Sequence, residues 1–211
     1  MRLYRGWLGL PEARVLRVPR WAARPMLWAG DLAGRLGWPS SLRTTALKQM
    51  DFNVAGDADR WPALTGLTPR TVAAALAETP ATVQDRWHAR LYFVRPVAVV
   101  TLSLFWILVG LIGLTFARDA AIVLLQGAGF GPWAAPVSDL GHVFDLAMGS
   151  ALLVRRWTAR VALGMAAVSV GYLVCATVFV PELWLDPVQP WLKVLPMMAL
   201  CLFVTATDAR R

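Results

Sequence analysis

Long apolar runs dominate the second half of the chain. Residues 96–116 and 161–180 contain no charged side chain. A helix of about 20 apolar residues crosses the ~30 Å hydrocarbon core of a bilayer. Residues 137–154 and 188–207 have a similar length but include ionisable side chains. The hydrophobic pattern therefore predicts four membrane-spanning helices, at about 96–116, 137–154, 161–180 and 188–207.

Residues 1–95 show shorter and more polar patterns. They predict helices at 20–37, 40–52, 68–77 and 82–94, a short strand at 13–19 and a loop at 53–62. In the first helix, one stripe is apolar and the other is charged: the apolar stripe holds Trp21, Trp28, Leu32 and Leu36, and the charged stripe holds Arg20, Arg24, Asp31 and Arg35. The expected fold is an all-α membrane protein, a four-transmembrane-helix bundle with a small, mostly helical cytoplasmic N-terminal segment.

Charge is distributed unevenly along the chain and sets the expected topology. Residues 1–95 hold fourteen of the 21 lysines and arginines. Basic clusters at 86–95, 155–160 and 210–211 all fall on one side of the predicted spans, as cytoplasmic loops do. We therefore expect a multi-pass protein of the bacterial inner (cytoplasmic) membrane with both termini in the cytoplasm. The net charge of +8 then reflects loops beside a membrane, and we expect no nucleic-acid partner.

The connection between the first two predicted spans contains a further apolar stretch. Residues 120–125 are apolar but too short to cross a bilayer, and a glycine-rich turn sequence follows them. A short interfacial helix and loop on the outer face is the favoured interpretation, and a re-entrant segment is the alternative.

Ionisable and phenolic side chains inside the predicted spans are the candidate site. The group comprises Asp139, His142, Asp145, Tyr172 and Lys193. Charged groups in hydrocarbon are costly and face a protein interior, a partner or water. One interpretation is a polar pocket, open to the outer side, that accepts a proton or the polar head of a quinone. The other is a structural contact between helices, in which Lys193 pairs with Asp139 or Asp145.

Two cysteines, Cys175 and Cys201, lie in different predicted spans. Their expected depths differ by roughly 12 Å at 1.5 Å per helical residue, whereas disulfide-bonded Cα atoms lie within about 7 Å. We expect two unpaired, buried structural thiols. The two histidines and two cysteines do not form a metal-ligand pattern, so we expect no metal site.

Several segments resemble the DoxX-like membrane family, over about residues 60–211. The resemblance rests on R-W-H-A-R-L-Y-F-V-R-P-V, L-S-L-F-W-I-L-V-G-L-I-G-L, D-L-A-M-G-S-A-L-L-V-R-R-W, P-E-L-W-L-D-P and L-K-V-L-P. The chain is most similar to DoxX-like modules fused C-terminally to short-chain dehydrogenase/epimerase-like, NAD(P)-binding domains. The resemblance implies three parts: a dehydrogenase-like remnant at 1–60, juxtamembrane helices at 61–95 and the membrane domain at 96–211.

The chain lacks the motifs that give such dehydrogenase-like domains their activity. It contains no glycine-rich dinucleotide fingerprint and no Tyr-x-x-x-Lys pair. We therefore expect no cofactor in this chain and no catalysis by it alone, as for the C-terminal portion of a split or truncated fusion. The resemblance implies an anchor or regulatory module for a separate NAD(P)-binding, dehydrogenase-like partner.

Two other functions remain open at this point, as does self-association. A quinone- or thiol-linked membrane oxidoreductase subunit would use the polar group on the predicted spans, with quinone as its cofactor. A small-solute or proton carrier would use the same group without redox chemistry. Besides the lipid bilayer and a dehydrogenase-like protein, a homo-oligomer is the remaining partner considered.

Overall fold

A computed structural model describes residues 2–14, 18–40, 42–49, 52, 60–187 and 189–208. Within these residues all regular structure is helical. The chain divides into two compact units, Met1–Tyr92 and Phe93–Arg211. The central residues of the predicted strand, most of the predicted 53–62 loop and the C-terminal arginines lie outside the described residues.

The first unit is built of short helices. They are α1 (Arg2–Trp7), α2 (Arg20–Arg35), α3 (Thr44–Gln49), α4 (Arg60–Thr65) and α5 (Val72–Glu78). Trp7 joins α1 to α5, because its indole N–H donates to the carbonyl oxygen of Thr79 at 2.6 Å. The end of the predicted loop is instead the start of α4, so that part of the prediction is wrong.

One helix pair holds most of the described packing in this unit. Gly30 of α2 lies against the backbone of Leu42, just before α3, so a side chain at Gly30 would clash. Asp31 accepts a hydrogen bond from the Thr44 hydroxyl at 2.7 Å and another from the Thr44 amide at 3.3 Å. Leu27 is the one buried hydrophobic side chain among the described residues of this unit. The unit therefore has a very small core, and most of its apolar side chains are exposed.

The long helices lie further along the chain. They are α6 (Val83–Leu114), α7 (Arg118–Leu125), α8 (Ala134–Leu152), α9 (Thr158–Phe179) and α10 (Val194–Ala206). The surface helix and first span predicted at 82–94 and 96–116 are one continuous helix, with Pro96 inside it. Proline removes one backbone donor, and membrane helices tolerate that loss where neighbouring groups compensate.

Among the described residues, three stretches are long and apolar enough to cross a membrane: Val83–Leu114, Arg118–Leu152 and Thr158–Phe179. Val194–Ala206 is a shorter apolar helix. The last predicted span, 188–207, is thus shorter than expected. Residues 190–193 form turns, and α10 begins only at Val194. Its 13 residues extend about 20 Å at 1.5 Å per residue.

The connection between α6 and α8 contains the expected short helix. After α7, residues Gln126–Phe130 form a π-helical turn and Gly131–Trp133 form a 3-10 turn. Gly129 has a φ of 92°, a left-handed conformation that favours glycine. The apolar 120–125 stretch is therefore helical, and a glycine turn follows it.

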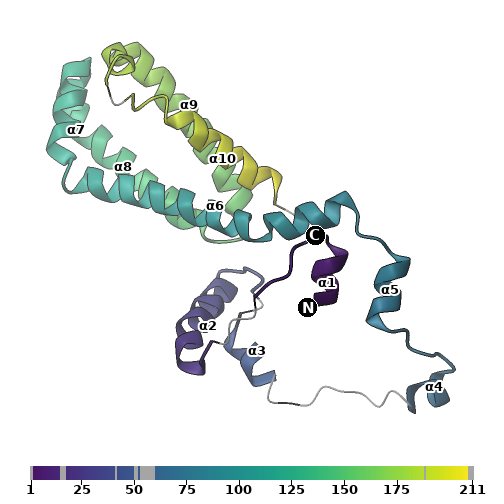
Figure 1. Ribbon diagram of the computed structural model, residues 1–211. Coiled ribbons are helices and arrows are strands. Elements are labelled where there is room, and N and C mark those ends of the chain that lie inside the picture. The colour runs from purple at the N-terminus through teal and green to yellow at the C-terminus, as the bar shows by residue number, and fades with distance from the viewer. Residues whose placement is uncertain are drawn as a thin grey trace. The chain divides into compact units, whose positions relative to one another are not determined.

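The second unit packs through small residues and a few fully buried side chains. Figure 1 shows α9 and α10 running side by side, with α8 close to α6. A Cβ at Gly149 of α8 would lie 2.9 Å from the Ser103 carbonyl oxygen of α6, and Ser103 donates to the Gly149 carbonyl at 2.7 Å. Close backbone approach at small residues is typical of helix pairs in membranes.

Candidate functional site

Asp139 lies one turn from the start of α8 and forms an ion pair with Arg118, the first residue of α7. The Arg118 guanidinium donates two hydrogen bonds to the carboxylate, Nε to Oδ1 at 2.8 Å and one terminal nitrogen to Oδ2 at 2.6 Å. The two side chains are 42% and 34% exposed. A two-pronged arginine–carboxylate contact defines both distance and orientation. Asp139 therefore ties α7 to α8.

His142 lies at the closest contact between α8 and α6. Its ring occupies the space that a side chain on Gly113 of α6 would need, and its carbonyl oxygen would lie 2.5 Å from a Cβ at Gly110. Its Nδ1 lies 3.4 Å from the Ser138 hydroxyl, one turn earlier on α8. The imidazole is thus held in the interface of two helices, and the glycines of α6 are what admit it.

Asp145 is the ionisable residue of α8 that lies farthest from the start of the helix, and it is only 5% exposed. It accepts a hydrogen bond from the Tyr172 hydroxyl of α9 at 3.1 Å. Tyr172 itself is 41% exposed, so the phenol reaches from the outer surface of α9 to the buried carboxylate. A buried polar group without such a partner would be costly in hydrocarbon.

Lys193 lies apart from this group. It is the N-cap residue of α10, and its side chain is exposed. Within the described part of the chain, neither Asp139 nor Asp145 forms an ion pair with it. The structure thus brings Asp145 and Tyr172 together, places His142 one turn away and gives Asp139 a different cationic partner.

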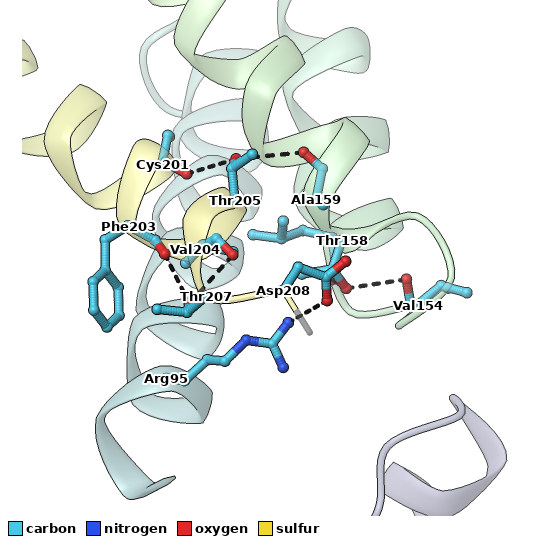
Figure 2. Close-up of polar contacts among 11 residues, drawn as sticks. Arg95, Val154, Thr158, Ala159, Cys201, Phe203, Val204, Thr205, Thr207 and Asp208 are labelled. Carbon is cyan, nitrogen blue, oxygen red and sulfur yellow. Dashed lines mark hydrogen bonds and ion pairs between the residues drawn. The ribbon is translucent and has the colours of Figure 1, made fainter. Parts of the chain in front are cut away.

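A second polar group, which the sequence analysis missed, lies at the opposite end of the helices (Figure 2). Arg95 of α6 donates to the Asp208 carboxylate, just beyond α10, at 2.6 Å, and the two side chains are 19% and 5% exposed. The contact joins residues 113 positions apart. Arg95 contributed to the topology prediction only as one member of a basic cluster. The available signal was that Arg95 and Asp208 flank the first and last predicted spans on the same side.

Threonine hydroxyls support the same end of the bundle, as Figure 2 shows. Thr158, fully buried at the start of α9, donates to the Leu152 carbonyl at 3.1 Å. Thr205 of α10 donates to the Cys201 carbonyl at 2.9 Å and lies 3.4 Å from the Ala159 carbonyl of α9. The Thr158 contact gives the last carbonyl of α8 a donor, and the Thr205 contacts follow the usual pattern in which threonine hydroxyls donate to helix carbonyls.

Both cysteines are free thiols, as predicted. Cys201 is fully buried, but Cys175 is exposed on α9, so the prediction of two buried thiols is wrong for Cys175. The apolar sequence around Cys175 predicts membrane insertion and does not say which side of the helix faces a neighbour. Among the described residues, no group of histidine, cysteine and carboxylate side chains is arranged to hold a metal ion.

Comparison with known proteins identifies a family for the membrane part of the chain. No curated protein and no solved structure matches the chain significantly. The DoxX-like family matches residues 103–202, which run from the middle of α6 through α7, α8 and α9 into α10. All five residues of the predicted site lie inside the matched region, whereas Arg95 and Asp208 flank it. Residues 103–202 are a DoxX-like family domain, built from helices of a multi-pass membrane protein.

Proposed function

We propose that the DoxX-like domain is a non-catalytic membrane anchor, and that the N-terminal helices attach a separate NAD(P)-binding, dehydrogenase-like protein to it. The proposal rests on the contacts that the polar side chains of the membrane helices make. Asp139 binds Arg118, Asp145 binds Tyr172, and His142 is packed against α6. Each contact connects two helices, which is the role of a stabilising contact in a bundle.

The first unit supports the second half of the proposal. Leu3 and Tyr4 of α1 are 56% and 50% exposed, and Leu42 and Phe52 are 50% and 72% exposed. Leu27 is the only buried hydrophobic side chain described in the unit. A unit with so small a core and so many exposed apolar side chains is consistent with a surface that a partner covers. The resemblance of residues 1–60 to the end of a dehydrogenase-like domain suggests the class of protein that would cover it.

Affinity capture from membranes tests the attachment. The full chain, tagged at its C-terminus, is extracted from its native host in a mild detergent, and captured proteins are identified by mass spectrometry. We expect a soluble protein with a glycine-rich dinucleotide fingerprint, together with NAD(P)H fluorescence in the eluate. Capture of no such protein at normal membrane levels of the chain contradicts the proposal.

A matched pair of variants locates the attachment surface. Leu3→Asp combined with Tyr4→Asp should abolish capture while the chain remains in the membrane at its usual level. Leu185→Asp, at an apolar position in the connection between α9 and α10 that is 89% exposed, is the control and should leave capture unchanged. Equal capture by both variants would remove α1 from the attachment surface.

A quinone-linked redox function is the second candidate, and the Asp145–Tyr172 contact is the observation in its favour. Tyr172 is exposed on α9 and its hydroxyl donates to the buried Asp145 carboxylate. It could therefore relay a proton between Asp145 and a quinone headgroup bound at the lipid-facing surface. This function predicts quinone-dependent turnover by purified protein that disappears in Tyr172→Phe. The anchor function predicts no turnover in either protein.

A further inference from the structure

Helix α2 carries an exposed stripe of large apolar side chains. Trp21 is 76% exposed, Trp28 is 75% exposed and Leu32 is 58% exposed. At 100° per residue these three positions fall within about 40° of one another around the helix axis. Leu27, Gly30 and Gly34 lie on the other side of α2, and the two glycines face the segment that leads into α3. The packed face and the stripe are therefore distinct surfaces of one helix.

Basic side chains border the stripe. Arg24 and Arg35 are exposed, and both lie within about 60° of Trp21 around the helix. The one acidic residue of α2, Asp31, is already engaged by Thr44 and Arg43. Its carboxylate is therefore not available to offset the arginines. The exposed side of α2 presents tryptophan, leucine and arginine together, with positive charge on its border.

This combination fits an anionic bilayer surface. Helices that lie in the plane of a membrane interface carry tryptophan and leucine on one face and lysine or arginine beside it. Tryptophan is favoured at the depth of the lipid headgroups, and basic residues near an anionic lipid surface are attracted to it. A protein partner would not require arginines along this border.

We propose that the Trp21–Trp28–Leu32 stripe of α2 binds the surface of an anionic bilayer, the same bilayer that the DoxX-like domain crosses. Covalent connection to membrane-spanning helices keeps α2 at a high local concentration near lipid, so weak interfacial affinity is sufficient. The proposal depends on membrane insertion and not on a dehydrogenase-like partner. It leaves the apolar side chains of α1 and those around α3 for such a partner.

Depth-dependent fluorescence quenching in proteoliposomes tests the proposal with the full-length protein. Cys175→Ser and Cys201→Ser remove both native thiols. A single cysteine is then introduced as Leu32→Cys, on the stripe, or as Met26→Cys, which is similarly exposed at 54% but about 120° away. Each is labelled with an environment-sensitive fluorophore, and the vesicles contain phosphatidylcholine with or without phosphatidylglycerol, plus nitroxide-labelled lipid.

The expected result is at least about twofold stronger quenching at position 32 than at position 26, because only the stripe enters the interface. Arg24→Gln combined with Arg35→Gln should reduce that difference in phosphatidylglycerol vesicles and have little effect in phosphatidylcholine alone. Monodisperse elution of every labelled variant in detergent verifies that the protein is folded. Equal quenching at the two positions, or no quenching at position 32 in anionic vesicles, overturns the proposal and means that the stripe is free for a protein partner.

Discussion

The ion pair between Arg95 and Asp208 provides the sharpest test of how the helices are held together. Asp208→Asn keeps the size of the side chain and removes its charge, so the Arg95 guanidinium loses its ion pair with Asp208, in which the two side chains are only 19% and 5% exposed. Removing one member of a buried ion pair destabilises a protein by about 3–5 kcal/mol. Because Asp208 lies just beyond the end of α10, where solvent approaches, we expect a loss somewhat below that range, about 2–3 kcal/mol.

Cys201 offers a direct readout of that loss. It is fully buried on α10, seven residues before Asp208, and in a Cys175→Ser background it is the only thiol in the chain. A fluorogenic maleimide can react with it only when α10 separates from its neighbours. A loss of about 2–3 kcal/mol corresponds to an increase of about 30- to 150-fold in the open population, and so in the labelling rate, when opening is fast relative to labelling.

Two further variants complete this experiment. Glu182→Gln removes a carboxylate that is exposed in the connection between α9 and α10, so its labelling rate should match that of the parent protein. Arg95→Asp combined with Asp208→Arg restores an ion pair in reverse and should recover part of the protection. If Asp208→Asn labels at the parent rate, the contact in Figure 2 does not stabilise the association of α10 with α6.

Four other predictions address the remaining contacts. Gly113→Leu should lower the detergent unfolding temperature by several degrees, since the new side chain would occupy the space of the His142 ring, whereas Gly127→Leu in the open connection should not. Tyr172→Phe removes the hydroxyl that donates to the buried Asp145 carboxylate, and it should lower the free energy of unfolding in detergent by about 1–3 kcal/mol. An impermeant maleimide of small size should label Cys175 far faster than Cys201 in detergent, and equal rates would contradict the packing of α10. The Thr44 hydroxyl, more than any other group, holds the pKa of Asp31 below its usual value, so the contact between α2 and α3 should be present above about pH 4 and weaken below it; hydrogen exchange corrected for intrinsic rates would measure this change.

The sequence predicted the membrane helices well because length and apolar composition almost determine them. Residues 96–116 and 161–180 had no competing interpretation, and they correspond to parts of α6 and to α9. Their hydrophobicity is nearly uniform around the helix axis, so it could not say which side faces a neighbour. That is why Cys175 was expected to be buried and is exposed. The start of α10 also differs from the prediction. The apolar run continues across Trp191, but residues 190–193 form turns and the helix begins only at Val194.

The candidate site was harder to predict than the fold. The partner of a polar side chain depends both on the rotation of its helix about the helix axis and on its depth in the membrane. The sequence analysis placed Asp139, His142 and Asp145 in one predicted span without their partners, and the structure gives each a contact on a neighbouring segment. Lys193, the basic residue expected to pair with Asp139 or Asp145, lies instead at the N-cap of a helix that is shorter than expected. The partner of Asp139 is Arg118, because a helix that starts at Arg118 brings its guanidinium beside that carboxylate.

The short α10 has a consequence for the lipid around the protein. Its helical part extends about 20 Å, while α6 and α9 exceed the ~30 Å of a typical hydrocarbon core. Acyl chains that contact α10 must compress or tilt to avoid exposing the turn at Trp191 to hydrocarbon, and those that contact α6 need not. The annulus of lipid is then thinner on one flank of the molecule than on the other. When two molecules associate through the sides where the bilayer is thinned, two deformed regions of bilayer become one. Membrane elasticity alone therefore favours association through these sides.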